Sequence, residues 1–213
     1  MPTAIEHVIW SAPEEARAGT TLVVTLHGRG ADERGMAGLL EHLPPGVTLA
    51  SVRAPISEGG GYAWFANRGI GRPLENSIKD TAQAMFGWLD HVADQHHKVA
   101  LIGFSGGTAM AGGLLFEQPG RFAGAVLLSG TLPWDAGLDS TPGRFEGVKV
   151  FWGNDEADQV IPRELMERSE AWLREESGAD LTVRHYPGLG HGIGVQELRD
   201  VHDFISGLIA AEG

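Results

Sequence analysis

Positions 99–115 of the 213-residue chain read VALIGFSGGTAMAGGLL. The apolar run 99–102 predicts a buried strand, and the small and apolar residues after position 107 predict a helix that follows it. Between them lies the pattern G-x-S-x-G, centred on Ser105, in the strand–turn–helix context that it requires. The sharp turn strains the serine backbone and leaves no room for side chains at Gly103 and Gly107. We interpret Ser105 as a candidate nucleophile, and the alternative is a glycine-rich turn without chemistry.

Short apolar runs and segments of helical periodicity alternate along the rest of the chain. The expected strands are 5–10 (at a sheet edge), 21–26, 47–52, 99–102, 125–128, 148–152 and 181–186. Besides the helix after Ser105, helices are expected at 78–93, 165–173 and 195–209. Continuous apolar strands separated by amphipathic helices predict an α/β fold with a mostly parallel central sheet and helices on both faces. No linker interrupts the series, which predicts a single domain over residues 1–213.

The composition excludes several classes of function. The chain has no cysteine, which rules out disulfides, thiolate metal sites and a cysteine nucleophile. Sixteen Lys and Arg against 28 Asp and Glu give a formal net charge of −12, which disfavours binding to nucleic acid and to anionic membranes. No apolar run approaches the roughly 20 residues that span a bilayer. The start of the chain lacks the features of a signal peptide, so we expect a cytoplasmic protein without stable membrane insertion.

A serine hydroxyl needs a base that removes its proton. Of the nine histidines, His191 lies in a glycine-rich loop after the last expected strand. Loops at the carboxyl ends of strands are where a parallel sheet builds its site. His185 lies inside a strand, and His27 ends a strand next to the segment that we consider below for the oxyanion hole. The other six fall on helices, helix flanks or the amino-terminal edge. His191 is therefore the candidate base.

The carboxylate that orients this base is expected in the loop after the strand at 148–152. That loop contains three acids, Asp155, Glu156 and Asp158. We favour Asp158, because the residues Val-Ile-Pro at 160–162 then anchor the loop to the next helix. Asp155 remains the rival, since it also lies close to the strand end, while Glu156 is interpreted as a solvated loop charge.

Acyl transfer also needs hydrogen-bond donors aimed at the tetrahedral oxyanion. One candidate is the backbone N–H of Gly106, next to the candidate nucleophile. The other lies after the strand that ends at His27, in the sequence Gly-Arg-Gly at 28–30. Its glycines allow the Arg29 N–H to point inward. The alternative for this segment is a turn that merely ends the strand.

Five motifs in order carry a resemblance to a known family: LHGRGAD at 26–32, YAWF at 62–65, GFSGG at 103–107, DQVIP at 158–162 and GH at 190–191. With them, nearly the whole chain resembles the phospholipase/carboxylesterase family of small serine α/β-hydrolases, and the order Ser105, Asp158, His191 matches that of such enzymes. The resemblance implies an α/β-hydrolase fold without a cap domain, these three residues as the triad, and backbone donors at Arg29 and Gly106. It further implies cleavage of esters or thioesters, no cofactor or metal, and a homodimer as a family-level expectation.

The sequence departs from the family at two positions. The family often has an apolar residue in place of Arg29 and glutamine in place of Gly106, which puts substrate preference in doubt. Arg29 and Arg68 are candidates to bind an anionic group of the substrate; the alternative is that they are solvated or pair with local acids. Aromatic candidates for the pocket walls are Trp64, Phe65 and Trp134, whose alternative role is packing of the loops.

The expected substrate is a small ester or thioester that is cleaved through an acyl-serine intermediate. Within the same chemistry, lysophospholipase and acyl-protein thioesterase activities remain alternatives. An alternative from a different functional class is a catalytically silent binding protein that keeps the hydrolase fold.

Overall fold

A seven-stranded sheet in the order β1-β3-β2-β6-β7-β8-β9 forms the centre of the computed structural model, which describes residues 4–210. Every neighbouring pair is parallel except β1 and β3, so the mostly parallel sheet is confirmed. The ends of the expected domain, 1–3 and 211–213, lie outside the described residues. The strands are β1 (Val8–Trp10), β2 (Thr21–Leu26), β3 (Val47–Val52), β4 (Ile56–Glu58), β5 (Gly61–Ala63), β6 (Lys98–Phe104), β7 (Gly124–Leu128), β8 (Lys149–Asn154) and β9 (Asp180–His185). The helices are α1 (Arg34–Ala37), α2 (Glu75–Val92), α3 (Gly106–Glu117), α4 (Arg163–Glu175) and α5 (Val195–Ala210).

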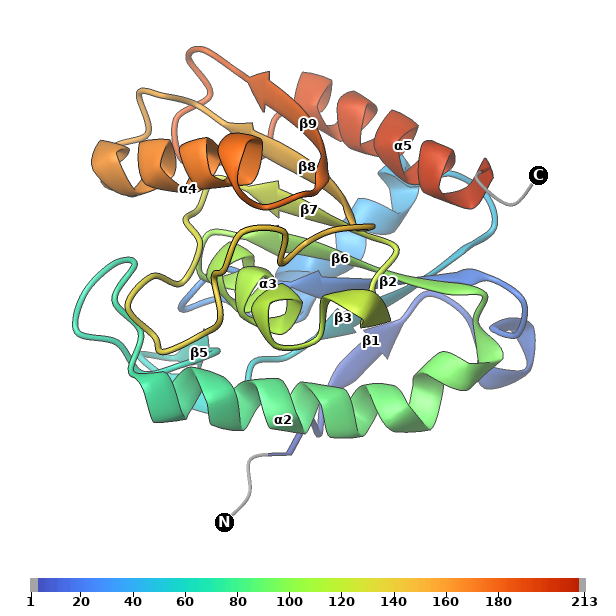
Figure 1. Cartoon of the computed structure of the whole chain (residues 1–213). Coiled ribbons are helices and arrows are strands. Elements are labelled where there is room, and N and C mark those ends of the chain that lie inside the picture. Colours follow the sequence, from blue (N-terminus) through green and yellow to red (C-terminus); the bar gives the residue numbers. More distant parts are fainter. Residues whose placement is uncertain (1–3, 211–213) are drawn as a thin grey trace.

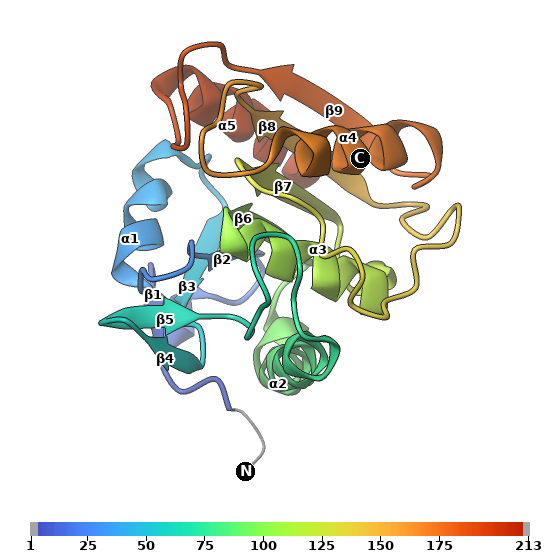
Figure 2. The same cartoon turned by 90° about the vertical axis from the view of Figure 1, so that its left-hand side faces the viewer.

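Helices cover both faces of the sheet (Figures 1 and 2). Helices α2, α3 and α4 pack on one face, and α1 and α5 pack on the other. Successive residues of a strand point to opposite faces. The buried apolar side chains form one cluster on each face of the sheet. In β2, Leu22 and Val24 belong to the cluster that contains Ile78 of α2, while Val23 belongs to the cluster that contains Ile205 of α5. Burial on both sides explains why the strands are almost continuously apolar.

The parallel arrangement brings distant loops to one edge of the sheet. Leu26 at the end of β2 pairs with Gly103 of β6, and Leu128 at the end of β7 pairs with Gly153 of β8. Because the carboxyl ends of parallel strands meet at the same edge, the segments that follow β2, β6, β7, β8 and β9 emerge together. The candidate residues from the sequence lie in these segments.

Three features differ from the sequence expectations. β4 and β5 form a separate hairpin whose turn residues, Gly59 and Gly60, have φ of 59° and 89°. Two consecutive positive φ values are typical of the two-residue turns that match the twist of paired strands. Helix α1 was also not expected, because four residues are too few to show a helical period. The edge strand begins at Val8 rather than at position 5.

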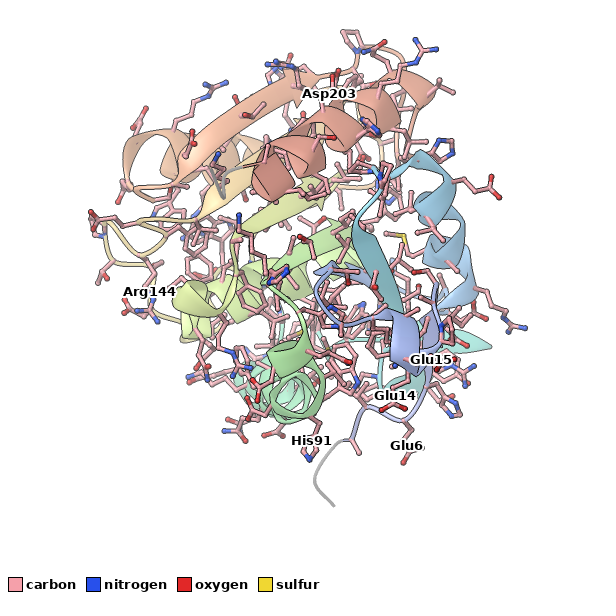
Figure 3. All side chains as sticks on the ribbon, turned by 90° about the vertical axis from the view of Figure 1, so that its right-hand side faces the viewer. Glu6, Glu14, Glu15, His91, Arg144 and Asp203 are labelled. Carbon is pink, nitrogen blue, oxygen red and sulfur yellow. The ribbon has the colours of Figure 1, made fainter. Side chains whose placement is uncertain are left out.

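Several acidic side chains lie on the outside of the molecule, whereas Glu33, Asp155, Asp158 and Glu197 are buried. Glu6, Glu14, Glu15 and Asp203 are exposed, and Figure 3 shows them at the periphery of the ribbon. Among residues 4–210, no helix combines the length and the apolar character needed to cross a membrane.

Candidate functional site

Ser105 lies on the turn between β6 and α3, with φ of 55° and ψ of −115°. Its backbone N–H donates to the Leu128 carbonyl oxygen at 3.0 Å. A Cβ at Gly103 would lie 2.4 Å from the Gly107 carbonyl oxygen, and a Cβ at Gly107 would lie 1.9 Å from the Leu26 carbonyl oxygen. Both positions therefore require glycine, because Gly103 lies against the backbone of the turn itself and Gly107 lies against the end of β2. The strain at Ser105 is of the kind that surrounding structure sustains at functional sites.

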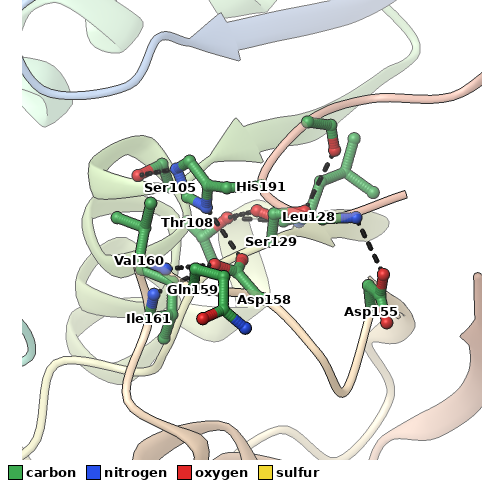
Figure 4. A network of polar contacts seen from close by, with 12 residues as sticks. Ser105, Thr108, Leu128, Ser129, Asp155, Asp158, Gln159, Val160, Ile161 and His191 are labelled. Carbon is green, nitrogen blue, oxygen red and sulfur yellow. Dashed lines mark hydrogen bonds and ion pairs between the residues drawn. The ribbon is translucent and has the colours of Figure 1, made fainter. Parts of the chain in front are cut away.

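Three side chains from three loops form a continuous chain of hydrogen bonds (Figure 4). Ser105 Oγ lies 3.1 Å from His191 Nε2, and His191 Nδ1 lies 2.8 Å from Asp158 Oδ2. Asp158 Oδ1 accepts from the backbone N–H groups of Val160 and Ile161 at 2.7 and 3.1 Å. A carboxylate accepts the Nδ1 proton, so this contact leaves Nε2 free to accept the Ser105 hydroxyl proton.

The other two acids of the loop after β8 have different partners. Asp155 Oδ2 accepts from the Gly190 N–H at 2.8 Å, and Oδ1 accepts from the Ala157 N–H at 2.9 Å. These backbone donors hold the pKa of Asp155 below its usual value. Glu156 is exposed, with a carboxylate oxygen 3.4 Å from Nδ1 of His185. The structure thus brings Asp158 to His191 and leaves Asp155 as a brace between the two loops.

The His191 loop is also held from the end of β7. Ser129 is buried and has φ of 41°, and its hydroxyl donates to the Gly192 carbonyl oxygen at 3.0 Å. Asp155 and Ser129 therefore secure the residues on either side of His191. Sequence reasoning missed the contact of Ser129, for which no local pattern gives a signal.

The expected donors of the oxyanion hole lie next to each other. A Cβ at Gly106 would lie 3.2 Å from the Arg29 backbone nitrogen. His27, two positions before Arg29, is buried and fixes the loop: Ala54 N–H donates to its Nε2 at 3.0 Å, and its Nδ1 lies 2.8 Å from the Gly28 carbonyl oxygen. Burial lowers the pKa of His27, which favours the neutral ring that the Ala54 bond requires.

The β4–β5 hairpin is attached to the Arg29 loop by backbone and side-chain contacts. Gly30 N–H donates to the Tyr62 carbonyl oxygen at 2.8 Å, and Tyr62 N–H donates to the Ala31 carbonyl oxygen at 2.9 Å. The Arg29 guanidinium forms an ion pair with Glu58. Sequence reasoning missed Glu58, and it used Tyr62 only as part of the motif at 62–65. The consecutive glycines 59 and 60 were the available signal for a hairpin.

Ser105 and His191 face a cavity of about 370 Å³. Trp64, Phe65 and Ile161 contribute to its apolar wall. Ile70 and Val160, also in the lining, are 43% and 45% exposed. Apolar walls with a few convergent polar groups are typical of sites for small molecules. Among residues 4–210, no group of three or more His, Asp or Glu side chains is arranged to hold a metal ion.

A sequence model of the phospholipase/carboxylesterase family matches residues 8–209. The chain belongs to this family. It is 25% identical over 194 residues to MhqD of Bacillus subtilis, with 89% of this chain and 94% of that protein covered. It is 21% identical over 221 residues to acyl-protein thioesterase 1 of Candida albicans, with 92% and 96% covered.

Solved structures agree with this assignment at the level of the fold. A carboxylesterase of Bacillus cereus superposes with a TM-score of 0.79 at 21% identity, over 94% of this chain and 93% of that one. Together with the family match, this likeness confirms the α/β-hydrolase fold expected from the sequence.

Two of the residues that the sequence analysis proposed for the substrate pocket, Trp134 and Arg68, do not line the cavity of this family member. Trp134 is buried and is not part of the cavity lining; its indole N–H donates to Ser169 Oγ at 3.1 Å, and its ring packs edge-on against Trp172. Arg68 faces a separate surface depression near the start of α2. Its N–H donates to the Arg72 carbonyl oxygen at 2.9 Å, and this reversal of the chain turns the intervening Ile70 toward the cavity instead.

A buried acid lies directly after the His191 loop. Glu197 of α5 has no exposed surface; its Oε2 accepts from the Gly194 N–H at 3.3 Å, and its Oε1 has no partner. Burial, with a contribution from the Asp200 carboxylate, raises the pKa of Glu197 to about 7. Sequence reasoning missed this residue, because an acid in the first helical turn is ordinarily solvated.

We expect Glu197→Gln to raise the free energy of unfolding at alkaline pH. The carboxyl is protonated below about pH 4.5 in both folded and unfolded chains, so it costs no stability there. Between about pH 4.5 and pH 7 the unfolded chain ionises first, and stability falls. Urea unfolding at pH 8.5 should show the variant more stable by about 2–3 kcal/mol, with little difference at pH 4.5. Glu164→Gln, at an exposed site, is the control, and equal shifts in both variants would contradict the expectation.

Proposed function

We propose that the protein hydrolyses carboxylic esters of small substrates through an acyl-serine intermediate, as one catalytic domain over residues 1–213. Its membership of the phospholipase/carboxylesterase family supports cleavage of esters or thioesters. The observation that carries the assignment of residues is the hydrogen-bond chain from Ser105 through His191 to Asp158 beside an apolar cavity. Serine, a base and an orienting carboxylate in this geometry activate a hydroxyl for attack on a carbonyl.

In the first half of the reaction, His191 Nε2 takes the Ser105 proton while Oγ forms a bond to the carbonyl carbon. Asp158 holds the imidazole and stabilises its charged form. The backbone N–H groups of Arg29 and Gly106 receive the oxyanion. The carbon–oxygen bond to the alcohol then breaks, and the alcohol leaves with the proton from His191.

In the second half, water repeats these steps against the acyl-serine. His191 takes a proton from the attacking water and returns it to Ser105 Oγ as the ester bond breaks. The free acid leaves and the resting site is restored.

A thioester is the second candidate substrate. The relative from Candida albicans is named acyl-protein thioesterase 1 and is covered over 96% of its length. The same nucleophile and oxyanion donors act on either carbonyl. A matched ester and thioester with the same acyl group separate the two candidates by kcat/KM.

Labelling with a fluorophosphonate tests the proposal directly. Ser105 Oγ should displace fluoride from phosphorus, and peptide mass spectrometry should find the adduct on residue 105. Ser105→Ala should lose the label, whereas Ser57→Ala, at an exposed site on β4, should keep it. A folded wild-type protein that remains unmodified would favour a silent binding protein.

A further inference from the structure

A residue with a permanent positive charge lines the same cavity as the candidate nucleophile Ser105. Among the lining residues in the described part of the chain, Arg29 alone carries such a charge, and its backbone nitrogen lies next to Gly106. A free arginine side chain at such a place can bind a substrate carboxylate or phosphate, since its planar fork matches both groups.

The guanidinium is already occupied from within the chain. Its Nε donates to Glu58 Oε1 at 2.6 Å, and its Nη2 donates to Glu58 Oε2. Nη1 donates to the Phe65 carbonyl oxygen at 2.9 Å. Glu58 thus holds the two-pronged position that a substrate carboxylate would take. The side chains of Arg29 and Glu58 are 30% and 42% exposed, so the pair is accessible to solvent at the rim.

We propose that Glu58 determines the charge specificity of the site. By neutralising Arg29, it makes the cavity select uncharged esters, and an anionic substrate has to compete with Glu58 for the guanidinium. This inference rests on the proposed esterase function and assigns it a substrate class. The formal net charge of −12 acts in the same direction, because it disfavours the approach of anions.

The backbone contacts allow the charge to be removed without detaching the hairpin. The hydrogen bonds that join Tyr62 to Gly30 and Ala31 do not involve Glu58. In Glu58→Gln, the amide oxygen still accepts from Arg29 Nε. The variant therefore frees the charge of Arg29 while it keeps one side-chain bond and both backbone bonds.

Two matched substrate pairs place a carboxylate on either side of the scissile bond. The first pair is 4-acetoxybenzoate and its methyl ester, with the charge on the leaving group. The second is mono-4-nitrophenyl adipate and 4-nitrophenyl hexanoate, with the charge on the acyl chain. The measured quantity is the kcat/KM of the anionic ester divided by that of the neutral one.

We expect wild type to favour the neutral ester, and Glu58→Gln to raise this ratio by about 5- to 20-fold in at least one pair, mainly through KM. Added salt should reduce the gain. Arg29→Gln leaves Glu58 unpaired and should lower the ratio below wild type. The double variant should return close to the wild-type ratio, because the effect requires both charges.

Glu14→Gln is the matched control, since it removes one acidic charge at an exposed position outside the cavity lining (Figure 3). An unchanged ratio in Glu58→Gln, the same gain in Glu14→Gln, or a gain that persists in the double variant would each overturn the inference. If Glu58→Gln does not fold, a ratio in Arg29→Gln equal to that of wild type overturns it. Absence of hydrolysis of the neutral esters by wild type would instead contradict the proposed function.

Discussion

The Ser105→Ala variant is expected to lose turnover of 4-nitrophenyl butyrate by roughly 10⁴- to 10⁶-fold in kcat. Alanine has no oxygen to attack the carbonyl, and the 3.1 Å contact with His191 Nε2 is lost. The small rate that remains comes from the oxyanion donors and from binding. Stopped assays with high enzyme concentration measure it.

The same variant should keep its fold. The backbone at residue 105 remains in the turn, where its N–H donates to Leu128 and Gly103 and Gly107 leave room. Thermal unfolding followed by circular dichroism should therefore resemble that of wild type. The control is Ser57→Ala, which should retain wild-type rates. A kcat in Ser105→Ala near that of wild type would contradict the proposed mechanism.

Asp158→Asn is expected to lower kcat by roughly 10³- to 10⁴-fold with little effect on stability. The N–H groups of Val160 and Ile161 require an acceptor, so the amide oxygen takes the place of Oδ1. The amide nitrogen then faces His191 Nδ1 in place of Oδ2. Nδ1 has to accept, Nε2 has to carry the proton, and His191 can no longer take the proton of Ser105.

Asp155→Asn is the matched comparison from the same loop. Its two oxygens accept from Gly190 and Ala157, and an amide can satisfy one of them. We expect a loss of about 1–2 kcal/mol in stability and about a tenfold fall in kcat. Steady-state kinetics and urea unfolding on both variants separate the roles. A larger fall in kcat for Asp155→Asn than for Asp158→Asn would make Asp155 the orienting acid.

Local rules account for the elements that the sequence predicted well. Strand β2 has the expected bounds of 21–26, because a strand buried on both faces must be apolar throughout. The glycines at 103 and 107 indicated the serine turn, because the room beside a tight turn is decided within a few residues. Family motifs placed Trp64 and Phe65, which line the cavity.

The direction in which a side chain points was harder to predict from the sequence. Trp134 and Arg68 lie in segments near the site, yet one turns into the core against Trp172 and the other turns to the surface. Asp155 and Asp158 lie three positions apart in one loop, and the loop conformation decides which of them reaches His191. Each outcome depends on hydrogen bonds with residues that are distant in the sequence.

The sequence by itself determined the fold class, the serine turn and the small set of residues from which a site could be built. Periodicity and the steric demands of a tight turn act over a few neighbouring residues, so a linear pattern records them. The tertiary structure decided that Asp158 rather than Asp155 contacts His191. It also decided that Glu58, 29 positions along the chain, accepts the hydrogen bonds of the Arg29 guanidinium. Charge neutralisation and hydrogen bonding of this kind depend on distances in space, which only the packing of the β4–β5 hairpin and the loops onto the sheet establishes.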